Sequence, residues 1–121
     1  MLTADVVIKV DNTKKILGLY GEALRKAYVE VGQKGEKNAK KELMRVVYDT
    51  PERGYKRTGR LLGSVKGDSD DSAAYIGTNL EYAPYVELGT SKMKKRPFLK
   101  PAATNYTAEY SSVFKKYLEN G

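Results

Sequence analysis

The segment YAPYVELGTSKMKKRPFLKP, residues 82–101, decides how the chain is organised. Its first part places four large apolar side chains at helical spacing: Tyr82, Tyr85, Val86 and Leu88. Pro84 suits only the first turn of a helix because proline lacks an amide hydrogen, and Gly89 can adopt the left-handed conformation that ends one. The sequence therefore predicts a helix of about two turns that closes at Gly89.

The next part, Thr90 to Arg96, has no apolar period and carries cations without an acid: Lys92, Lys94, Lys95 and Arg96. Like charges within a Debye length of about 8 Å must face solvent or an anionic partner, so this segment is predicted to be a loop. One interpretation is an ordinary solvated loop. The other is a binding segment that becomes ordered on a partner, because it lies between the Gly89 stop and Pro97.

Two prolines, Pro97 and Pro101, restrict the backbone on either side of Phe98 and Leu99. Large apolar side chains held in this way lose little conformational entropy on binding. We therefore predict that Phe98 and Leu99 act as an anchor that fills an apolar pocket of another subunit.

Upstream, residues 50–65 read TPERGYKRTGRLLGSV, in which Thr58 can cap a short turn that contains Leu61. This segment, YAPYVELGT and KKRPFLKPA together resemble the P..TG.L..S, YA..VE.GT and PFL.PA segments of the tail-completion, or neck, proteins of long-tailed double-stranded DNA phages. The resemblance covers most of the chain in the same order. One departure is Lys95 before Arg96, where the family often has a small residue.

The resemblance implies a structural virion protein that completes the tail or joins it to the head connector as a homo-oligomeric ring, a hexamer. Implied partners are copies of itself and tail-tube, tail-terminator or head-connector proteins, with assembly in the host cytoplasm. We expect the Thr90–Arg96 loop to dock on acidic residues of a neighbour, and Glu87 to pair with Arg96 or a neighbouring cation. The expected interface residues are Tyr82, Tyr85, Glu87, Thr90, Lys92, Lys94, Lys95, Arg96, Phe98 and Leu99. The expected turn-forming residues are Thr58, Gly59, Leu61, Pro84, Gly89, Pro97 and Pro101.

Composition limits the fold and the chemistry independently. A chain of 121 residues should form one domain, residues 1–121, that buries roughly 65% of its unfolded surface. The chain has no cysteine and no histidine, which excludes disulfides, thiol nucleophiles, histidine bases and the usual zinc sites. The segment MLTADVVIKV is unlike a secretion signal, and no stretch has the ~18 apolar residues of a membrane span. We expect a soluble, cytoplasmically made protein with no membrane contact.

The first half of the chain predicts a strand over Val6–Val10, ended by Asp11 or Asn12, and then one long helix to about Tyr48. The helical apolar positions are Ile16, Leu17, Tyr20, Leu24, Ala27, Tyr28, Val31, Leu43, Val46 and Val47. Gly32 and Gly35 weaken the helix interior, so a kink, if one occurs, is expected between Val31 and Asn38. They indicate either local flexibility or the close approach of a neighbouring helix.

Two short strands, residues 64–66 and 73–77, are predicted to form a hairpin around GDSDDS. A final helix carries an apolar face formed by Ala103, Tyr106, Tyr110, Val113, Phe114, Tyr117 and Leu118. The predicted fold is therefore α+β, a small antiparallel β-sheet packed against one long N-terminal helix and a C-terminal helix.

No pair of acids and bases is spaced for hydrolysis and no phosphate-binding glycine motif is present, so we expect neither an enzyme nor a cofactor. GDSDDS is an oxygen-rich sequence, but it lacks the closing glutamate of a calcium loop, and a solvated turn is the preferred interpretation. The net charge of +7 and ten tyrosines leave a second hypothesis open, a basic domain that contacts DNA non-specifically. Core or interface positions explain most tyrosines better. Basic clusters at residues 53–60 and 92–100 flank acidic residues, which favours pairing between copies: Asp68, Asp70, Asp71, Glu81 and Glu87.

Overall fold

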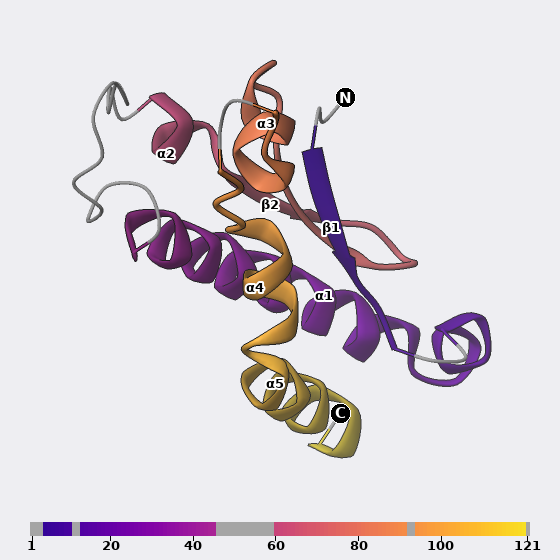
Figure 1. Cartoon of the computed structure of the whole chain (residues 1–121). Helices are drawn as coiled ribbons and strands as arrows, with labels where there is room; N and C mark the ends of the chain where they lie inside the picture. The colour runs from indigo at the N-terminus through magenta and orange to yellow at the C-terminus, as the bar shows by residue number, and fades with distance from the viewer. Residues whose placement is uncertain (1–3, 11–12, 46–59, 92–93, 121) are drawn as a thin grey trace.

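A long helix lies across a three-stranded antiparallel sheet, with the C-terminal helix beside it, in the computed structural model (Figure 1). The structure describes residues 4–10, 13–45, 60–91 and 94–120. This architecture confirms the predicted α+β class. In chain order the elements are β1 (Ala4–Ile8), α1 (Thr13–Leu43), α2 (Arg60–Ser64), β2 (Lys66–Ser69), β3 (Ala74–Thr78), α3 (Ala83–Leu88), α4 (Leu99–Thr104) and α5 (Thr107–Asn120).

The sheet has the order β1-β3-β2, so the last strand in sequence is the central one. Strand β1 pairs with β3 from Ala4 opposite Thr78 to Ile8 opposite Ala74. The predicted strand, Val6–Val10, was therefore two residues too far along the chain. It ends at Ile8 because β3 begins opposite that residue, and the Val10 amide instead donates to the Tyr28 hydroxyl at 3.2 Å.

The predicted hairpin is present, but its first strand is displaced from 64–66 to Lys66–Ser69. Residues Gly67 to Ser69 were expected in the turn and instead continue the ladder with β3. The turn is short because Asp70 closes it, accepting hydrogen bonds from the Ser72 amide at 2.7 Å and the Ala73 amide at 3.0 Å. This is the side-chain-to-backbone bonding that makes aspartate common in turns.

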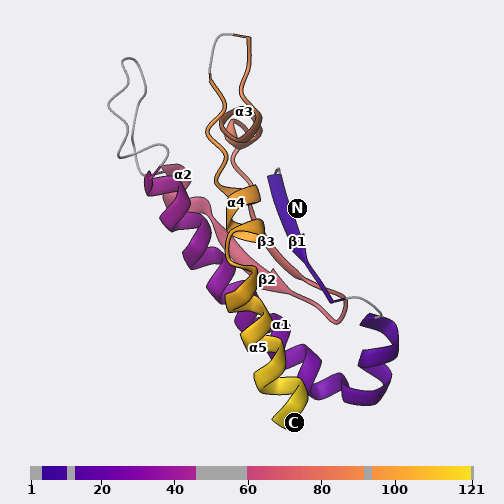
Figure 2. The same cartoon turned by 60° about the horizontal axis from the view of Figure 1, so that its bottom comes forward.

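Helix α1 is kinked at Tyr20, where φ is −135° and ψ is 38°. The helix continues regularly between Val31 and Asn38, where the sequence placed the main risk of a kink, as the prediction of one long helix required. Figure 2 shows the first turns of α1 bent away from the rest of the helix. The predicted positions Asp11, Asn12, Val46, Val47 and Tyr48 lie outside the described residues.

Gly32 and Gly35 let α1 lie close to the sheet. One of the two interpretations expected a neighbouring helix at these glycines, but the element that approaches them is the sheet. A Cβ on Gly32 would come within 2.9 Å of the Asp68 carbonyl oxygen, and one on Gly35 would overlap the Ile76 side chain. Opposite them, a Cβ on Gly67 would collide with the Gly32 carbonyl. Glycine at all three positions therefore sets the spacing between helix and sheet.

The C-terminal helical region is two helices rather than one. Helix α4 ends where the Asn105 amide donates to the Pro101 carbonyl at 2.8 Å, and α5 begins at Thr107 with a change of direction (Figure 1). The predicted apolar face is still the packed one, because Tyr110 and Val113 are buried and Tyr106, Phe114, Tyr117 and Leu118 pack against the core.

The core has two adjoining parts along α1. The first joins the N-terminal half of α1 to α5 and β3: Leu24, Ala27, Tyr28, Val31, Ala74, Tyr110 and Val113. The second joins its C-terminal half to α2, β3, α3 and α4: Ala39, Leu43, Leu61, Val65, Ile76, Ala83, Val86, Phe98, Leu99 and Ala102. The segment predicted to organise the chain thus belongs to the second part.

Candidate subunit interface

Helix α3 turns its larger apolar side chains outward. Ala83 and Val86 are buried against the core, whereas Tyr82, Tyr85 and Leu88 are 37%, 57% and 75% exposed. These three residues recur every third position and therefore share one side of the helix. A group of large apolar side chains left in solvent marks a contact surface more often than a single exposed residue does.

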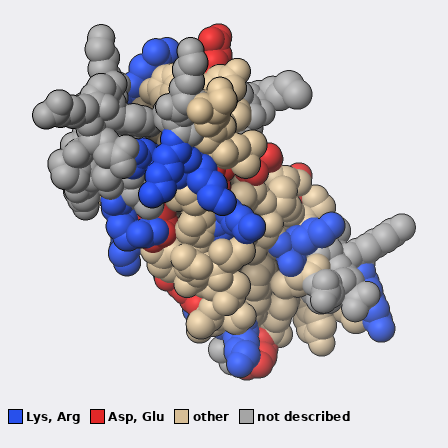
Figure 3. All heavy atoms as spheres, in the orientation of Figure 1, with Lys and Arg blue, Asp and Glu red and all other residues tan. Residues whose placement is uncertain are grey.

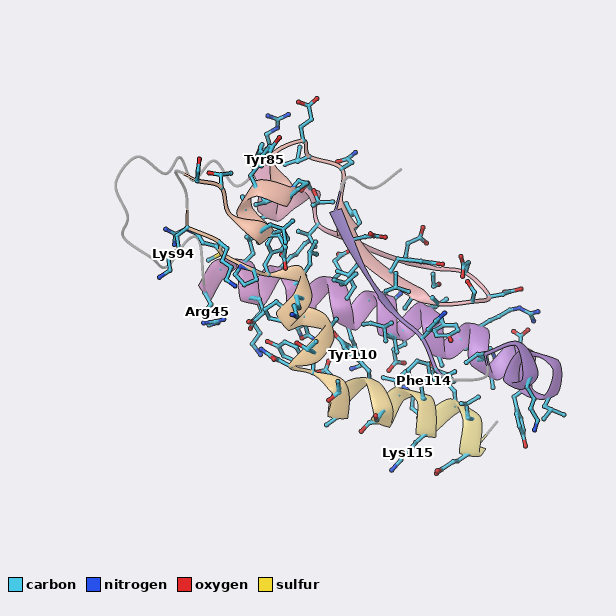
Figure 4. The ribbon with its side chains drawn as sticks, turned by 45° about the vertical axis from the view of Figure 1, so that its right-hand side comes forward. Arg45, Tyr85, Lys94, Tyr110, Phe114 and Lys115 are labelled. Carbon is cyan, nitrogen blue, oxygen red and sulfur yellow. The ribbon has the colours of Figure 1, made fainter. Side chains whose placement is uncertain are left out.

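Local sequence explains the shape of α3. Pro84 lies in its first turn, and Gly89 ends it with φ of 78° while its amide donates to the Tyr85 carbonyl at 2.8 Å. Both turn predictions, Pro84 and Gly89, are thus confirmed by the geometry. Figure 4 shows Tyr85 on the outer side of this helix.

Glu87 ties α3 to the start of α4. One oxygen of its carboxylate accepts hydrogen bonds from the Phe98 and Leu99 amides, both at 2.9 Å, and the other accepts one from the Lys100 amide at 3.0 Å. These donors are the otherwise unsatisfied amides at the beginning of a helix, where a negative charge is also favoured. Glu87, which we expected to pair with a cation, therefore serves as a cap for α4.

The loop between α3 and α4 leaves and rejoins the core at almost the same place. Besides the Glu87 bonds, the Arg96 amide donates to the Val86 carbonyl at 2.7 Å. Residues Gly89 to Lys95, which we call the basic arm, thus start and end at one base. Lys94 and Lys95 are exposed on this arm, as are Thr90 and Ser91, and Lys92 lies outside the described residues.

The anchor prediction for Phe98 and Leu99 is wrong. Their side chains are 0% and 1% exposed, and they belong to the core of their own chain together with Leu43, Val65 and Ile76. The prolines on either side do restrict this pair, but it holds the base of the basic arm to the core. Phe98 and Leu99 are not available to fill a pocket of another subunit.

Arg96 is also misplaced among the docking cations, because it is only 8% exposed. A residue buried to this extent does not present its charge to a partner. Of the predicted interface residues, the structure leaves Tyr82, Tyr85, Thr90, Lys94 and Lys95 at the surface. Leu88 is also at the surface, although it was not among the predicted interface residues. Its spacing from Tyr82 and Tyr85 already indicated that the three side chains share one side of the helix.

Of the other predicted turn residues, Leu61 is buried in α2, and Thr58 and Gly59 lie outside the described residues. The Ser64 hydroxyl ends α2 by contacting the Leu61 carbonyl at 2.7 Å and the Thr78 hydroxyl at 2.6 Å. These bonds connect the end of α2 to the central strand.

Positive charge gathers at the end of the molecule where α1 ends and α4 begins (Figure 3). Exposed cations in this region come from α1 and from the chain on either side of residue 97: Lys37, Lys41, Arg45, Lys94, Lys95 and Lys100. Figure 4 places Lys94 and Arg45 at this same end. We call this group the basic end of the molecule.

The acids near the basic end are used within the chain. Glu42 is buried and contacts Arg45 at 3.0 Å and the Tyr106 hydroxyl at 2.9 Å. Burial, and then the Glu42 carboxylate, raise the pKa of Tyr106. Lys41 lies 5.7 Å from the centre of the Tyr106 ring, a cation-π distance. Internal pairing of the acids leaves the surface lysines to dominate the potential there.

Within the described residues, no group of three or more acidic side chains is arranged to hold a metal ion, and no helix is long and apolar enough to cross a membrane. The candidate site combines the outward face of α3 with the basic arm, which adjoins α3 through the bond between the Arg96 amide and the Val86 carbonyl. No protein-family model, curated protein or solved structure matches the chain.

Proposed function

We propose that this protein is a structural subunit of a phage neck or tail, which completes the tail or joins it to the head connector as part of a ring. The observation that carries this proposal is the outward face of α3, Tyr82, Tyr85 and Leu88, beside the exposed Lys94 and Lys95 of the basic arm. Aromatic and aliphatic side chains next to cations are typical of the centre and rim of a protein interface.

The construction of the basic arm supports binding rather than catalysis. Its base is fixed by the Glu87 bonds and by Phe98 and Leu99 in the core, so the exposed part is held at a defined place on the surface. A base that is already fixed limits the entropic cost of binding a partner. The resemblance of YAPYVELGT and KKRPFLKPA to the neck family supplies the class of partner, other virion proteins.

Purified particles of a phage that encodes this chain test the proposal. A photo-reactive benzoylphenylalanine at Tyr85 should cross-link to another virion subunit after irradiation. The same group at Tyr20, which is 50% exposed on the bent part of α1, is an exposure-matched control and should cross-link less. Absence of the chain from washed particles, or absence of any cross-link from position 85, would contradict the proposal.

A second candidate function is non-specific contact with DNA, which the basic end favours. Lys41, Arg45, Lys94, Lys95 and Lys100 could neutralise several phosphates at once. Binding of this kind falls steeply with salt, because counterions are released from the DNA. A titration of labelled duplex between roughly 50 and 200 mM salt separates the candidates: a loss of about 10³-fold supports DNA contact, and no binding at low salt excludes it.

A further inference from the structure

A groove of about 650 Å³ lies at the basic end, between the last turns of α1, α2 and the start of α5. Met44 and Leu62 supply its apolar lining, and Met44 is 40% exposed. Lysines surround them: Lys37, Lys40 and Lys41. The lining of this groove shares no residue with the outer face of α3 or with the basic arm.

The charge of the groove favours an acidic occupant. Lys40 pairs with Glu36 at 3.4 Å, but Lys37 and Lys41 lie four residues apart on α1, where like charges repel. The one acidic residue of the lining, Glu109, accepts a long hydrogen bond of 3.5 Å from the Asn38 amide group. A carboxylate entering the groove would relieve the repulsion between Lys37 and Lys41.

The same chain carries an acidic turn beside the N-terminal half of α1. The β2–β3 turn, residues 70–73, lies near the N-terminal half of α1, at the end opposite α2 (Figures 1 and 2). Its carboxylates are exposed, and that of Asp71 lies 2.8 Å from Arg25 in the N-terminal half of α1. The turn is held in shape by Asp70, which also accepts a hydrogen bond from the Tyr75 hydroxyl at 2.9 Å.

We propose that the groove of one copy binds the acidic β2–β3 turn of the next copy, so that the subunits associate head to tail. This inference rests on the proposed function, since it specifies the contact between copies of the chain. It leaves the outer face of α3 and the basic arm for a different virion protein. A contact between two different surfaces of identical chains is heterologous, and it generates a ring when the rotation closes.

Shape distinguishes this occupant from nucleic acid. The groove is concave, whereas duplex DNA presents its phosphates on a wide convex surface. A narrow turn of four residues can enter a concave site. Because its hydrogen bonds already fix it, the turn loses little conformational freedom on binding.

Charge exchange between the two surfaces tests the inference on the full-length chain. The groove variant is K37E/K41E. The turn variant is D68K/D71K, which reverses Asp71 in the turn and Asp68 in the adjoining strand β2, with Asp70 kept because it closes the turn. The double reversal K15E/K115E changes the same number of lysines at exposed positions outside the groove and is the matched control. Sedimentation equilibrium at roughly 50 mM salt measures association, and circular dichroism verifies folding.

We expect the wild type and K15E/K115E to associate, and each of the two surface variants to associate at least tenfold more weakly. An equimolar mixture of K37E/K41E and D68K/D71K should recover association, because each chain then meets an oppositely charged partner surface. A monomeric wild type at low salt, a groove variant that associates normally, or a mixture that stays monomeric would overturn the inference. None of these results affects the cross-link from position 85, whose absence would instead contradict the proposed function.

Discussion

The carboxylate of Glu87 accepts the backbone amide of Phe98 at 2.9 Å, across a loop of ten residues. Through this bond the last turn of α3 caps the first turn of α4. The side chain of Phe98 is at the same time fully buried in the core. The exposed cations of the basic arm are therefore presented from a base that is fixed both by hydrogen bonds and by packing.

Removal of the Glu87 carboxylate should destabilise the fold. Glu87→Ala leaves three amides without their acceptor, and we expect a loss of about 2 kcal/mol in the free energy of unfolding. Glu87→Gln should cost less, because one oxygen can still serve Phe98 and Leu99. Urea denaturation measures both, with Glu81→Ala at an exposed position as the control. Equal stability of Glu87→Ala and Glu81→Ala would show that the cap is not needed.

Truncation should destabilise the fold strongly at Phe98 and very little at Tyr85. Phe98→Ala opens a cavity in the core and should lower the free energy of unfolding by about 3–5 kcal/mol. Tyr85→Ala removes an exposed ring and should change it by less than about 0.5 kcal/mol. Thermal unfolding of the two variants compares them directly. A stable Phe98→Ala protein would restore the idea that Phe98 acts as an external anchor.

Gly35 should not tolerate a methyl group. Gly35→Ala places a Cβ on the Ile76 side chain, and overpacking of this kind typically costs about 1–3 kcal/mol. Gly18→Ala is the matched control, since no atom lies within 4 Å of its Cβ position, and it should stabilise the helix by roughly 0.5–1 kcal/mol. The two substitutions should therefore change the free energy of unfolding in opposite directions, which urea denaturation measures. A neutral Gly35→Ala would mean that α1 can move away from the sheet without cost.

The turn that closes the hairpin should weaken in acid. Hydrogen bonds from the Ser72 hydroxyl and amide, and then from the Tyr75 hydroxyl, lower the pKa of Asp70 to about 2. A carboxyl whose folded pKa is lowered stabilises the fold above its unfolded pKa of about 3.9 and loses this contribution as the pH falls towards 2. Carboxyl-carbon NMR should give a midpoint near 2 for Asp70. A midpoint at the ordinary value would contradict the bonded geometry, and Asp70→Asn should remove this part of the pH dependence.

The local sequence pattern predicted where helices begin and end better than it predicted which residues they pack against. The stop at Gly89 and the start near Pro84 follow from backbone chemistry that needs no tertiary contact, and both were predicted correctly. The Phe98–Leu99 pair looks the same in sequence whether its pocket belongs to its own chain or to another. Only the return of the chain to α3, fixed by Glu87 and the Arg96 amide, places that pair in the core.

The glycines of α1 show the same limit. Gly32 and Gly35 indicated a close neighbour, but the identity of that neighbour depends on how the sheet crosses the helix, which helical periodicity does not contain. The kink occurs instead at Tyr20, between Gly18 and Gly21, two residues that sequence reasoning did not weigh. The lysine groove was missed as well, because its residues come from α1, α2 and α5 and meet only in the fold.

The central claim is tested most directly by counting phage heads joined to tails in particles made with Lys94 and Lys95 reversed to glutamate. Both side chains are exposed, so K94E/K95E should fold normally, and K15E/K115E is the control for the change in net charge. Electron microscopy of lysates should show separate heads and tails for K94E/K95E and joined particles for the control. Normal numbers of joined particles with folded K94E/K95E protein would contradict the claim that the basic arm contacts another virion subunit.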